Sequence, residues 1–200
     1  MFKDELSQLL FPSRCLSCSA LGPSICSQCR STWNPHIYRQ TIDGLVIYSS
    51  IRYTHTAQKI VLGAKESGLK VCDELVIGAL KASLQYFMRE RGDGLLVPIP
   101  SRASARRKRA RDFILDLTTQ LDCPAQQLLE IKRFVRDQSR LTHEQRAKNL
   151  AGAFHAHAIT QGEVILIDDV VTSGSTLLEA KKALARRGIV VKGAITAVMA

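Results

Sequence analysis

The chain has 200 residues, of which 46% are hydrophobic and 23% are charged, and its formal net charge is +10. This length favours one main domain with at most a small appendage, and it is sufficient to bury a sizeable core. No stretch contains the roughly 18 consecutive apolar residues that a membrane-spanning helix needs. The positive charge predicts an anionic partner, which could be nucleic acid, a phosphorylated metabolite or an acidic membrane surface.

The N-terminal segment, residues 2–11, is an apolar-rich lead that we expect to dock on the body of the protein. Asp4 and Glu5 stand where a secretory signal peptide would carry basic residues. We therefore expect a cytoplasmic protein.

Two CxxC pairs follow, separated by a short spacer. Their cysteines are Cys15, Cys18, Cys26 and Cys29. Four thiolates on two tight turns can surround one tetrahedral Zn²⁺, which supplies folding energy that so few residues cannot gain from an apolar core. Two disulfides or a thioredoxin-like redox pair would need an oxidising compartment or a βαβ setting, and neither is indicated. We predict a structural zinc site, and we expect Cys72 and Cys123 to be buried free thiols.

The next segment predicts one strand and two helices. Residues 44–53 are rich in β-branched and aromatic residues, as in a strand, whereas residues 56–64 and 69–91 carry apolar residues at helical spacing. Three lysines make this region basic, and we interpret them as a solvated helix face rather than as ligand contacts. They are Lys59, Lys65 and Lys70.

Residues 95–100, LLVPIP, form a short apolar strand that two prolines end. The densest positive segment of the chain comes directly after it. Its cations are Arg102, Arg106, Arg107, Lys108, Arg109 and Arg111. This segment could grip pyrophosphate or a nucleic-acid backbone; the alternative is a solvated basic turn. An amphipathic helix is expected to start at Phe113.

Residues 128–135 are predicted to form another strand, which leads into a polar, sparsely apolar segment over residues 136–149 that we expect to be mobile. Within it, Thr142 and Gln145 make a capping box that opens a helix.

The most informative stretch is VILIDDVVTSGSTL, residues 164–177. Its four apolar residues predict a parallel strand that is covered on both faces. Asp168 and Asp169 close that strand, a small hydroxyl-rich turn follows, and a helix is expected over residues 177–187. A strand, a loop of exposed N–H groups and a helix N-terminus form an anion site suited to a phosphate. The neighbouring carboxylates could accept hydrogen bonds from a sugar diol.

Two other interpretations of this stretch are less favourable. A nucleoside-triphosphate loop would carry Gly and Lys before its Ser/Thr and would not place two acids ahead of the loop. An ordinary strand-turn-helix corner does not explain so many small polar residues. The stretch instead resembles the phosphoribosyl pyrophosphate (PRPP) motif of the type I phosphoribosyltransferases.

Strands alternate with helices over residues 44–200, ending in an apolar strand over residues 189–199. The expected fold class is therefore α/β, a parallel sheet flanked by helices with its ligand site at the carboxyl ends of the strands. We expect an N-terminal arm with a zinc finger over residues 1–40 and a phosphoribosyltransferase-like domain over residues 41–200.

The chain as a whole resembles the ComF family, bacterial competence proteins with a type I phosphoribosyltransferase-like domain and an N-terminal zinc finger. The resemblance rests on the four-cysteine knuckle, the VPIP strand end, the Arg-rich segment, RDQSRLTHEQRAKNLAGAF and IDDVVTSGST, in this order. One stretch departs from the family pattern: Arg-Gly-Phe-Asn-Gln is replaced by RDFIL at residues 111–115.

The resemblance implies a role for each matching residue. Asp168 and Asp169 would be the catalytic acids that face the ribose hydroxyls of PRPP. The 5′-phosphate would be cradled by Thr172, Ser173, Gly174, Ser175 and Thr176. Contacts to pyrophosphate or nucleic acid would come from Arg102, Arg106, Arg107, Arg109 and Arg111. A flexible loop over the site would contain Arg136, Gln138, Arg140 and Arg146. Mg²⁺ would be chelated mainly by oxygens of PRPP.

The resemblance implies a protein that binds PRPP and single-stranded DNA and assists DNA uptake or processing in natural transformation. Its partners would include a competence helicase or the uptake machinery at the inner membrane. Acids beside the ribose and cations beside the leaving group suit the oxocarbenium character of phosphoribosyl transfer, but no base for a nucleophile is evident. The alternatives are a metabolic phosphoribosyltransferase making a nucleotide or amine, and a PRPP-sensing module without catalysis.

Overall fold

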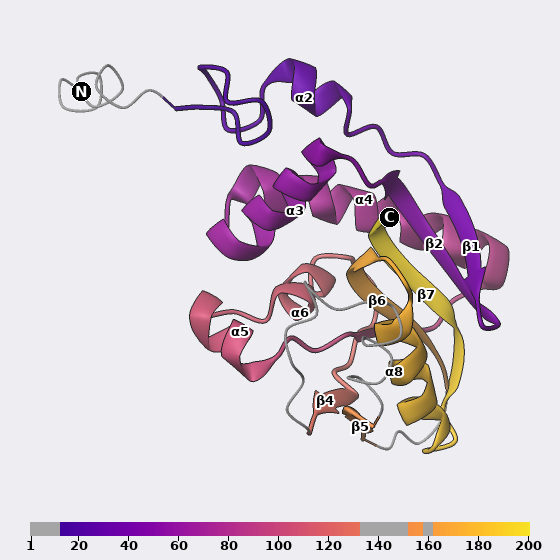
Figure 1. Ribbon diagram of the computed structural model, residues 1–200. Helices are drawn as coiled ribbons and strands as arrows, with labels where there is room; N and C mark the ends of the chain where they lie inside the picture. The colour runs from indigo at the N-terminus through magenta and orange to yellow at the C-terminus, as the bar shows by residue number, and fades with distance from the viewer. Residues whose placement is uncertain (1–12, 133–151, 158–161) are drawn as a thin grey trace.

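The structure, a computed structural model, describes residues 13–132, 152–157 and 162–200. Within these residues, a central sheet has five strands in the order β1-β2-β7-β6-β3 (Figure 1). These are β1 (Tyr38–Ile42), β2 (Leu45–Arg52), β7 (Val190–Met199), β6 (Glu163–Val171) and β3 (Leu95–Pro98). All neighbouring strands are parallel except β1, which is antiparallel to β2. The predicted α/β class is confirmed, and the sheet is parallel as predicted apart from the edge strand β1.

Helices cover both faces of the sheet. The helices of the described residues are α2 (Ser27–Ser31), α3 (His55–Ser67), α4 (Lys70–Arg91), α5 (Ala103–Arg109), α6 (Phe113–Thr118) and α8 (Ser175–Ala185). Helices α3 and α4 lie on one face, and α8 lies on the other (Figure 1). A separate antiparallel pair, β4 (Leu129–Ile131) and β5 (Phe154–Ala156), packs beside α8.

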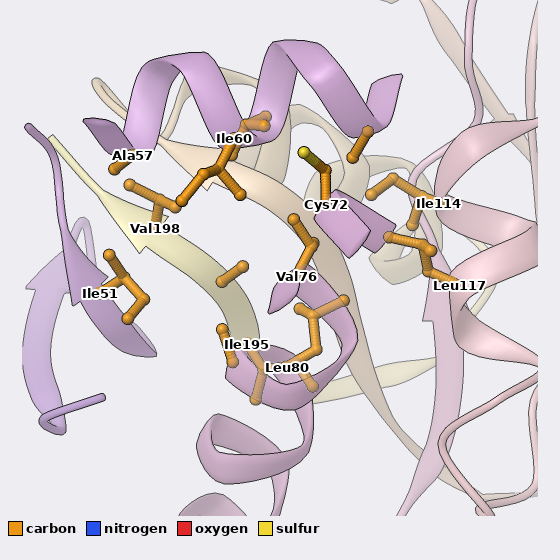
Figure 2. Packing of buried hydrophobic residues seen from close by; sticks show 14 of the residues in the cluster. Ile51, Ala57, Ile60, Cys72, Val76, Leu80, Ile114, Leu117, Ile195 and Val198 are labelled. Carbon is orange, nitrogen blue, oxygen red and sulfur yellow. The ribbon is translucent and has the colours of Figure 1, made fainter. Parts of the chain in front are cut away.

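Most buried apolar side chains in the described part of the chain belong to two clusters, one on each face of the sheet. Strand β6 contributes to both, because successive side chains of a strand point to opposite faces. Ile165 and Ile167 pack on the α3 and α4 side, whereas Val164 and Leu166 pack on the α8 side. The first cluster is shown in Figure 2, where its labelled members include Ile60, Val76, Leu80 and Ile195.

Helix α3 is fixed by local signals at both ends. The Thr54 hydroxyl accepts a hydrogen bond from the backbone N–H of Ala57 at 3.1 Å, which satisfies a free donor of the first turn. At the other end, Gly68 adopts the left-handed conformation (φ 60°), which glycine enters at little cost. The position of the last helical turn, where Lys65 lies, is therefore well determined.

Several elements differ from the sequence expectations. Strand β6 continues through the two aspartates to Val171, because Asp168, Val170 and Val171 pair with β7, and α8 begins at Ser175. Strand β1 was not predicted. Strand β4 is short and belongs to the separate antiparallel pair rather than to the parallel sheet.

Some expectations fall outside the described residues. They are the N-terminal lead, the capping box at Thr142 and Gln145, and the proposed flexible-loop residues Arg136, Gln138, Arg140 and Arg146. The domain boundary after residue 40 stays a prediction; strand β1 crosses this position.

None of the helices in the described residues has the length and apolar character required to cross a membrane.

Candidate functional site

The two aspartates of β6 have different surroundings. Asp168 is partly exposed and, with the following loop and the start of α8, lines a small pocket of about 30 Å³. Asp169 is 5% exposed and is directed toward α3. The sequence expected both carboxylates to face the ribose; in the structure, Asp168 is the one that lines the loop pocket.

The hydroxyl-rich loop after β6 forms a tight turn around Gly174. This residue has φ 70°, and a Cβ added to it would lie 2.8 Å from Cδ1 of Ile42 on β1. Both the left-handed backbone and the close contact exclude a side chain here. The hydroxyls of Ser173 and Ser175 lie 2.9 Å apart, at the N-terminus of α8. The turn thus brings hydroxyl groups and backbone N–H groups together where a helix N-terminus favours an anion.

Lys65 of α3 forms an ion pair with Asp169. Its Nζ lies 2.6 Å from Oδ2 of Asp169 and 5.8 Å from the centre of the Phe113 ring. The side chain of Lys65 remains 31% exposed, whereas that of Asp169 is 8% exposed. The ammonium is thus the more accessible member of a largely buried ion pair.

With this ion pair in place, the pKa values of the two aspartates are shifted in opposite directions. Burial and the neighbouring Asp169 carboxylate raise the pKa of Asp168 well above its ordinary 3.8, although Lys65 acts against this. Burial also acts to raise the pKa of Asp169, but the charge of Lys65 and its hydrogen bond outweigh burial and leave that pKa below 3.8. For Lys65, burial acts to lower the pKa, yet the two carboxylates leave it above 10.5.

Lys65 was assigned to a solvated helix face from the sequence, and this assignment is wrong. One signal was present: Lys65 follows Val61 by four residues and adjoins Ala64, and both of these are buried. Residues four apart lie on the same face of a helix, so Lys65 borders the packed stripe of α3.

A larger pocket of about 580 Å³ opens beyond the end of β3. Six of its lining residues are titratable: Arg102, Arg106, Arg107, Glu130, Lys132 and His157. The N–H of Ile99 donates to the carbonyl of Ile167 at 3.0 Å, so the next residues, Pro100 and Asp168, are neighbours at the same edge of the sheet. Pro100 lines the large pocket and Asp168 lines the small one. A cationic pocket therefore adjoins the acidic residue.

The five arginines expected at an anion site separate into two groups. Arg102, Arg106 and Arg107 line the large pocket, and Arg106 also lies 3.6 Å from Asp112. Arg109 and Arg111 are instead held in ion pairs within the protein. Arg109 Nη1 lies 2.8 Å from Glu66 of α3.

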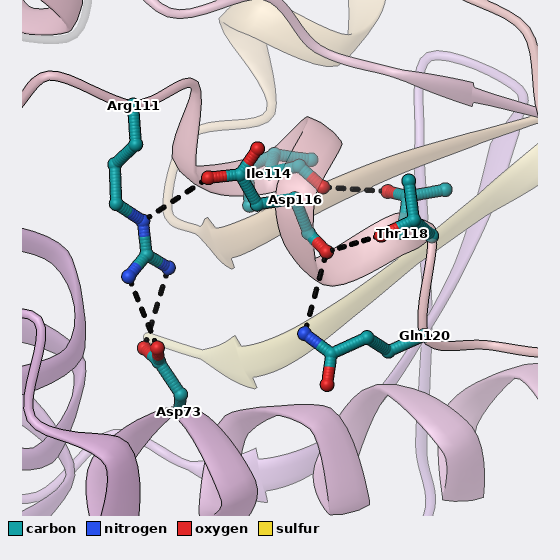
Figure 3. A network of polar contacts seen from close by, with 7 residues as sticks. Asp73, Arg111, Ile114, Asp116, Thr118 and Gln120 are labelled. Atoms are coloured by element: carbon teal, nitrogen blue, oxygen red, sulfur yellow. Dashed lines mark hydrogen bonds and ion pairs between the residues drawn. The ribbon is translucent and has the colours of Figure 1, made fainter.

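Arg111 connects α4 to α6 (Figure 3). It donates from two nitrogens to Asp73, at 3.0 and 3.4 Å, and its Nε lies 3.4 Å from Asp116. Its guanidinium also lies 5.1 Å from the centre of the Phe113 ring. These contacts indicate a packing role for Arg111.

The departure from the ComF pattern falls in this connection. Asp112, where the family stretch has Gly, has φ −95°. Any residue adopts this conformation, so the backbone does not require Gly here. The residue with a left-handed backbone conformation near this stretch is Ala110, at the end of α5, with φ 54°.

The four cysteines of the N-terminal knuckle come together as predicted. The Sγ atoms of Cys15, Cys18, Cys26 and Cys29 all lie within 4.8 Å of one another. Tetrahedral Zn²⁺ with bonds of about 2.3 Å places sulfurs about 3.8 Å apart, so a small contraction suffices. Backbone N–H groups of Cys26 and Cys29 point at Sγ of Cys15 and Cys26, at 3.4 and 3.5 Å. This donor set fits one zinc ion held by thiolates.

The other cysteines and the single tryptophan are not part of this cluster. Cys72 is buried, as expected, and burial raises the pKa of its thiol to about 11. Cys123 is only partly buried, so that part of the expectation is wrong. Trp33 is buried against the knuckle and is not available for base stacking.

Solved structures that resemble the chain include adenine phosphoribosyltransferases. The Saccharomyces cerevisiae enzyme, complexed with D-2,5-dideoxy-2,5-imino-altritol 1,6-bisphosphate and adenine, is 12% identical, with 82% of this chain and 83% of that chain covered and a TM-score of 0.44. A second adenine phosphoribosyltransferase is 12% identical, with 82% and 85% covered and a TM-score of 0.40. The Leishmania donovani enzyme is 12% identical, with 68% of each chain covered and a TM-score of 0.37. No protein-family model and no curated protein sequence matches the chain. At these values the likeness is one of fold and assigns no role to any residue.

Proposed function

We propose that the chain binds PRPP with Mg²⁺ at the junction of β6 and α8 and that it is a phosphoribosyltransferase of the pyrophosphate-releasing class. The observation that carries this proposal is the placement of Asp168 beside a hydroxyl-rich loop at a helix N-terminus. The loop, Thr172 to Thr176, is suited to the 5′-phosphate, since helix N-termini and free N–H groups attract anions. The Asp168 carboxylate can accept hydrogen bonds from the ribose hydroxyls.

The large cationic pocket supports the same proposal. Arg102, Arg106, Arg107 and Lys132 carry four positive charges, against one carboxylate from Glu130. A diphosphate leaving group next to Asp168 would be stabilised by these cations as negative charge develops on it. Mg²⁺ would be held mainly by oxygens of the ligand.

Titration calorimetry of Mg²⁺–PRPP tests the binding claim. We expect Asp168→Asn to weaken binding by roughly tenfold or more, because a carboxylate acceptor gives charge-assisted hydrogen bonds that are about twice as strong as neutral ones. Asp122→Asn is the matched control, since Asp122 is exposed and its ion-pair partner among the described residues is Lys81. Equal affinity in the wild type and Asp168→Asn would refute the assignment.

Turnover is tested separately, by pyrophosphate release when a nucleobase or ammonia is added to the PRPP complex. Release that is lost in Asp168→Asn supports the transferase. Binding of PRPP without any release would instead make the chain a PRPP-sensing module.

A second candidate function is binding of single-stranded DNA, as the ComF resemblance implies, in a protein that assists natural transformation with a competence helicase or the uptake machinery. The observation that favours it is the exposed side of α5, where Arg106 and Arg107 lie. With Trp33 buried, binding would depend on phosphate contacts rather than on base stacking.

Fluorescence anisotropy of a labelled oligonucleotide across salt concentrations tests this second function. Each phosphate contact on a single strand contributes about 0.7 to the slope of log affinity against log salt. We expect Arg107→Gln to reduce the slope by about that amount. A salt-independent affinity would exclude phosphate contacts as its basis.

A further inference from the structure

We infer that Lys65 is a positioning residue of the proposed PRPP site, which holds the Asp169 carboxylate on the α3 side of the sheet so that Asp168 alone presents its carboxylate to the ligand. This inference rests on the proposed function. It adds to it a residue from another part of the chain and gives the two acids different roles.

The first step is the geometry of β6. Asp168 and Asp169 are adjacent near the carboxyl end of the strand, and their carboxylates have different neighbours. Asp168 lines the loop pocket. Asp169, 5% exposed, meets Lys65 instead.

The second step is the cost of burying Asp169. A carboxylate removed from water is strongly unfavourable unless a partner compensates its charge. Lys65 Nζ at 2.6 Å supplies that charge. The other charged groups that act on this pair are Asp168 on β6 and, on Lys65, Arg109 of α5. Lys65 is therefore the single cation in contact with Asp169 among the described residues.

The third step is the anchoring of Lys65. The next residue, Glu66, binds Lys108 at 3.2 Å and Arg109 at 2.8 Å, which joins the last turn of α3 to α5. At the other end of α3, the Thr56 hydroxyl lies 2.9 Å from that of Ser17 in the cysteine knuckle. A helix held at both ends fixes Lys65 against Asp169 before any ligand binds.

The consequence concerns protonation. Without Lys65, the buried Asp169 carboxylate would lack its partner and would take up a proton. Asp168 and Asp169 are neighbours, so both would then titrate as one coupled pair. Because Lys65 also acts to lower the pKa of Asp168, its loss would extend the pH dependence of ligand binding to higher pH than in the wild type.

The test is the affinity for Mg²⁺–PRPP, measured by calorimetry from pH 5.5 to 8.5. We expect Lys65→Met to bind roughly tenfold more weakly at the acidic end, with a deficit that shrinks as the pH rises and the carboxylates ionise. Lys65→Arg keeps the charge and should stay within about threefold of the wild type. Lys70→Met removes an exposed lysine next to α3 and should change nothing.

The double variant Lys65→Met/Asp169→Asn tests whether the effect of Lys65→Met depends on the Asp169 carboxylate. It buries no unpaired charge, so it should fold even if Lys65→Met does not, and its affinity should lose the added pH dependence. A deficit of Lys65→Met that is equal at every pH, or one that the double variant retains, would overturn the inference.

Failure of the proposed function would look different. If the wild type bound no PRPP, the proposed function would be wrong. The role of Lys65 could still be tested without ligand, by measuring how the free energy of unfolding in urea depends on pH. We expect the stability of Lys65→Met to fall more steeply than that of the wild type as the pH rises above about 4, and the double variant to lose this extra slope. Equal slopes in all three proteins would refute control of Asp169 by Lys65.

Discussion

The hydroxyl oxygens of Ser17 and Thr56 lie 2.9 Å apart and join the cysteine knuckle to helix α3. The knuckle also packs on this helix through Leu16, whose Cδ1 lies 2.9 Å from the position a Cβ would take on Gly63. Cys15, Cys29 and Trp33 belong to the same buried cluster as α3 and α4. The folding of the knuckle and the placement of α3 are therefore coupled.

The first prediction concerns the metal. Elemental analysis of the purified protein should find about one zinc per chain, and Cys15→Ser should lose it, because a closed structural site needs all four thiolates. The melting temperature should fall with zinc loss, since the free energy of metal binding contributes to folding and the knuckle packs on α3. Cys123 lies outside the cluster, so the Cys123→Ser variant should keep the zinc. A folded wild type that contains no metal would contradict the assignment.

The second prediction concerns the contact between the knuckle and α3. Gly63→Ala should destabilise the protein by about 1–3 kcal/mol, because its Cβ would lie 2.9 Å from both Cys72 Sγ and Leu16 Cδ1. Gly78→Ala is a matched control in α4, where nothing lies within 4 Å of the added Cβ. It should stabilise the helix by about 0.5–1 kcal/mol. Urea unfolding of both variants measures the difference, and equal effects would refute the packing argument.

The third prediction concerns the turn at the phosphate loop. Gly174→Ala should cost more stability than Gly188→Ala, although both glycines have φ near the left-handed region, at 70° and 74°. Backbone strain costs about 1–2 kcal/mol at either position, but the Cβ at residue 174 would also meet Ile42 at 2.8 Å. Chemical denaturation of both variants tests this, and Ile42→Ala combined with Gly174→Ala should recover part of the excess cost. If the two single variants were equally stable, the contact with Ile42 would be unimportant.

The fourth prediction concerns pH. The pKa of Asp168 is raised by burial and by Asp169 above its ordinary 3.8, so above that pH the folded state binds more protons than the unfolded chain. Stability then falls as the pH rises through this window. Asp168→Asn removes this loss and should be more stable than the wild type at pH 8 by on the order of 1 kcal/mol, with a smaller difference at pH 4.

Urea unfolding between pH 4 and 8 measures this effect, with Asp122→Asn as a control for an exposed carboxylate. Asp169→Asn should behave in the opposite way, because it leaves the Lys65 ammonium without its partner and costs about 2 kcal/mol at neutral pH. A stabilised Asp169→Asn would show that the ion pair does not act as described.

Sequence alone determined the features that depend on local pattern. The apolar run at Val164 to Ile167, the acids behind it and the small turn residues were enough to predict a strand, an anion-binding loop and a helix, since each has its own residue preferences. The CxxC spacing likewise predicted the cluster of four sulfurs, because two tight turns need only a few residues to bring them together.

Only the tertiary structure decided which charged residues meet. Lys65 and Asp169 are 104 residues apart in the chain, and Arg111 lies between Asp73 and Asp116 on two different helices. Such pairs depend on how helices pack across a sheet, and a basic residue in a pattern does not reveal whether a carboxylate will lie opposite it. For this reason the sequence pattern predicts a solvated face for Lys65 and a ligand contact for Arg111, whereas the packing of α3, α4 and α6 places each beside an acid.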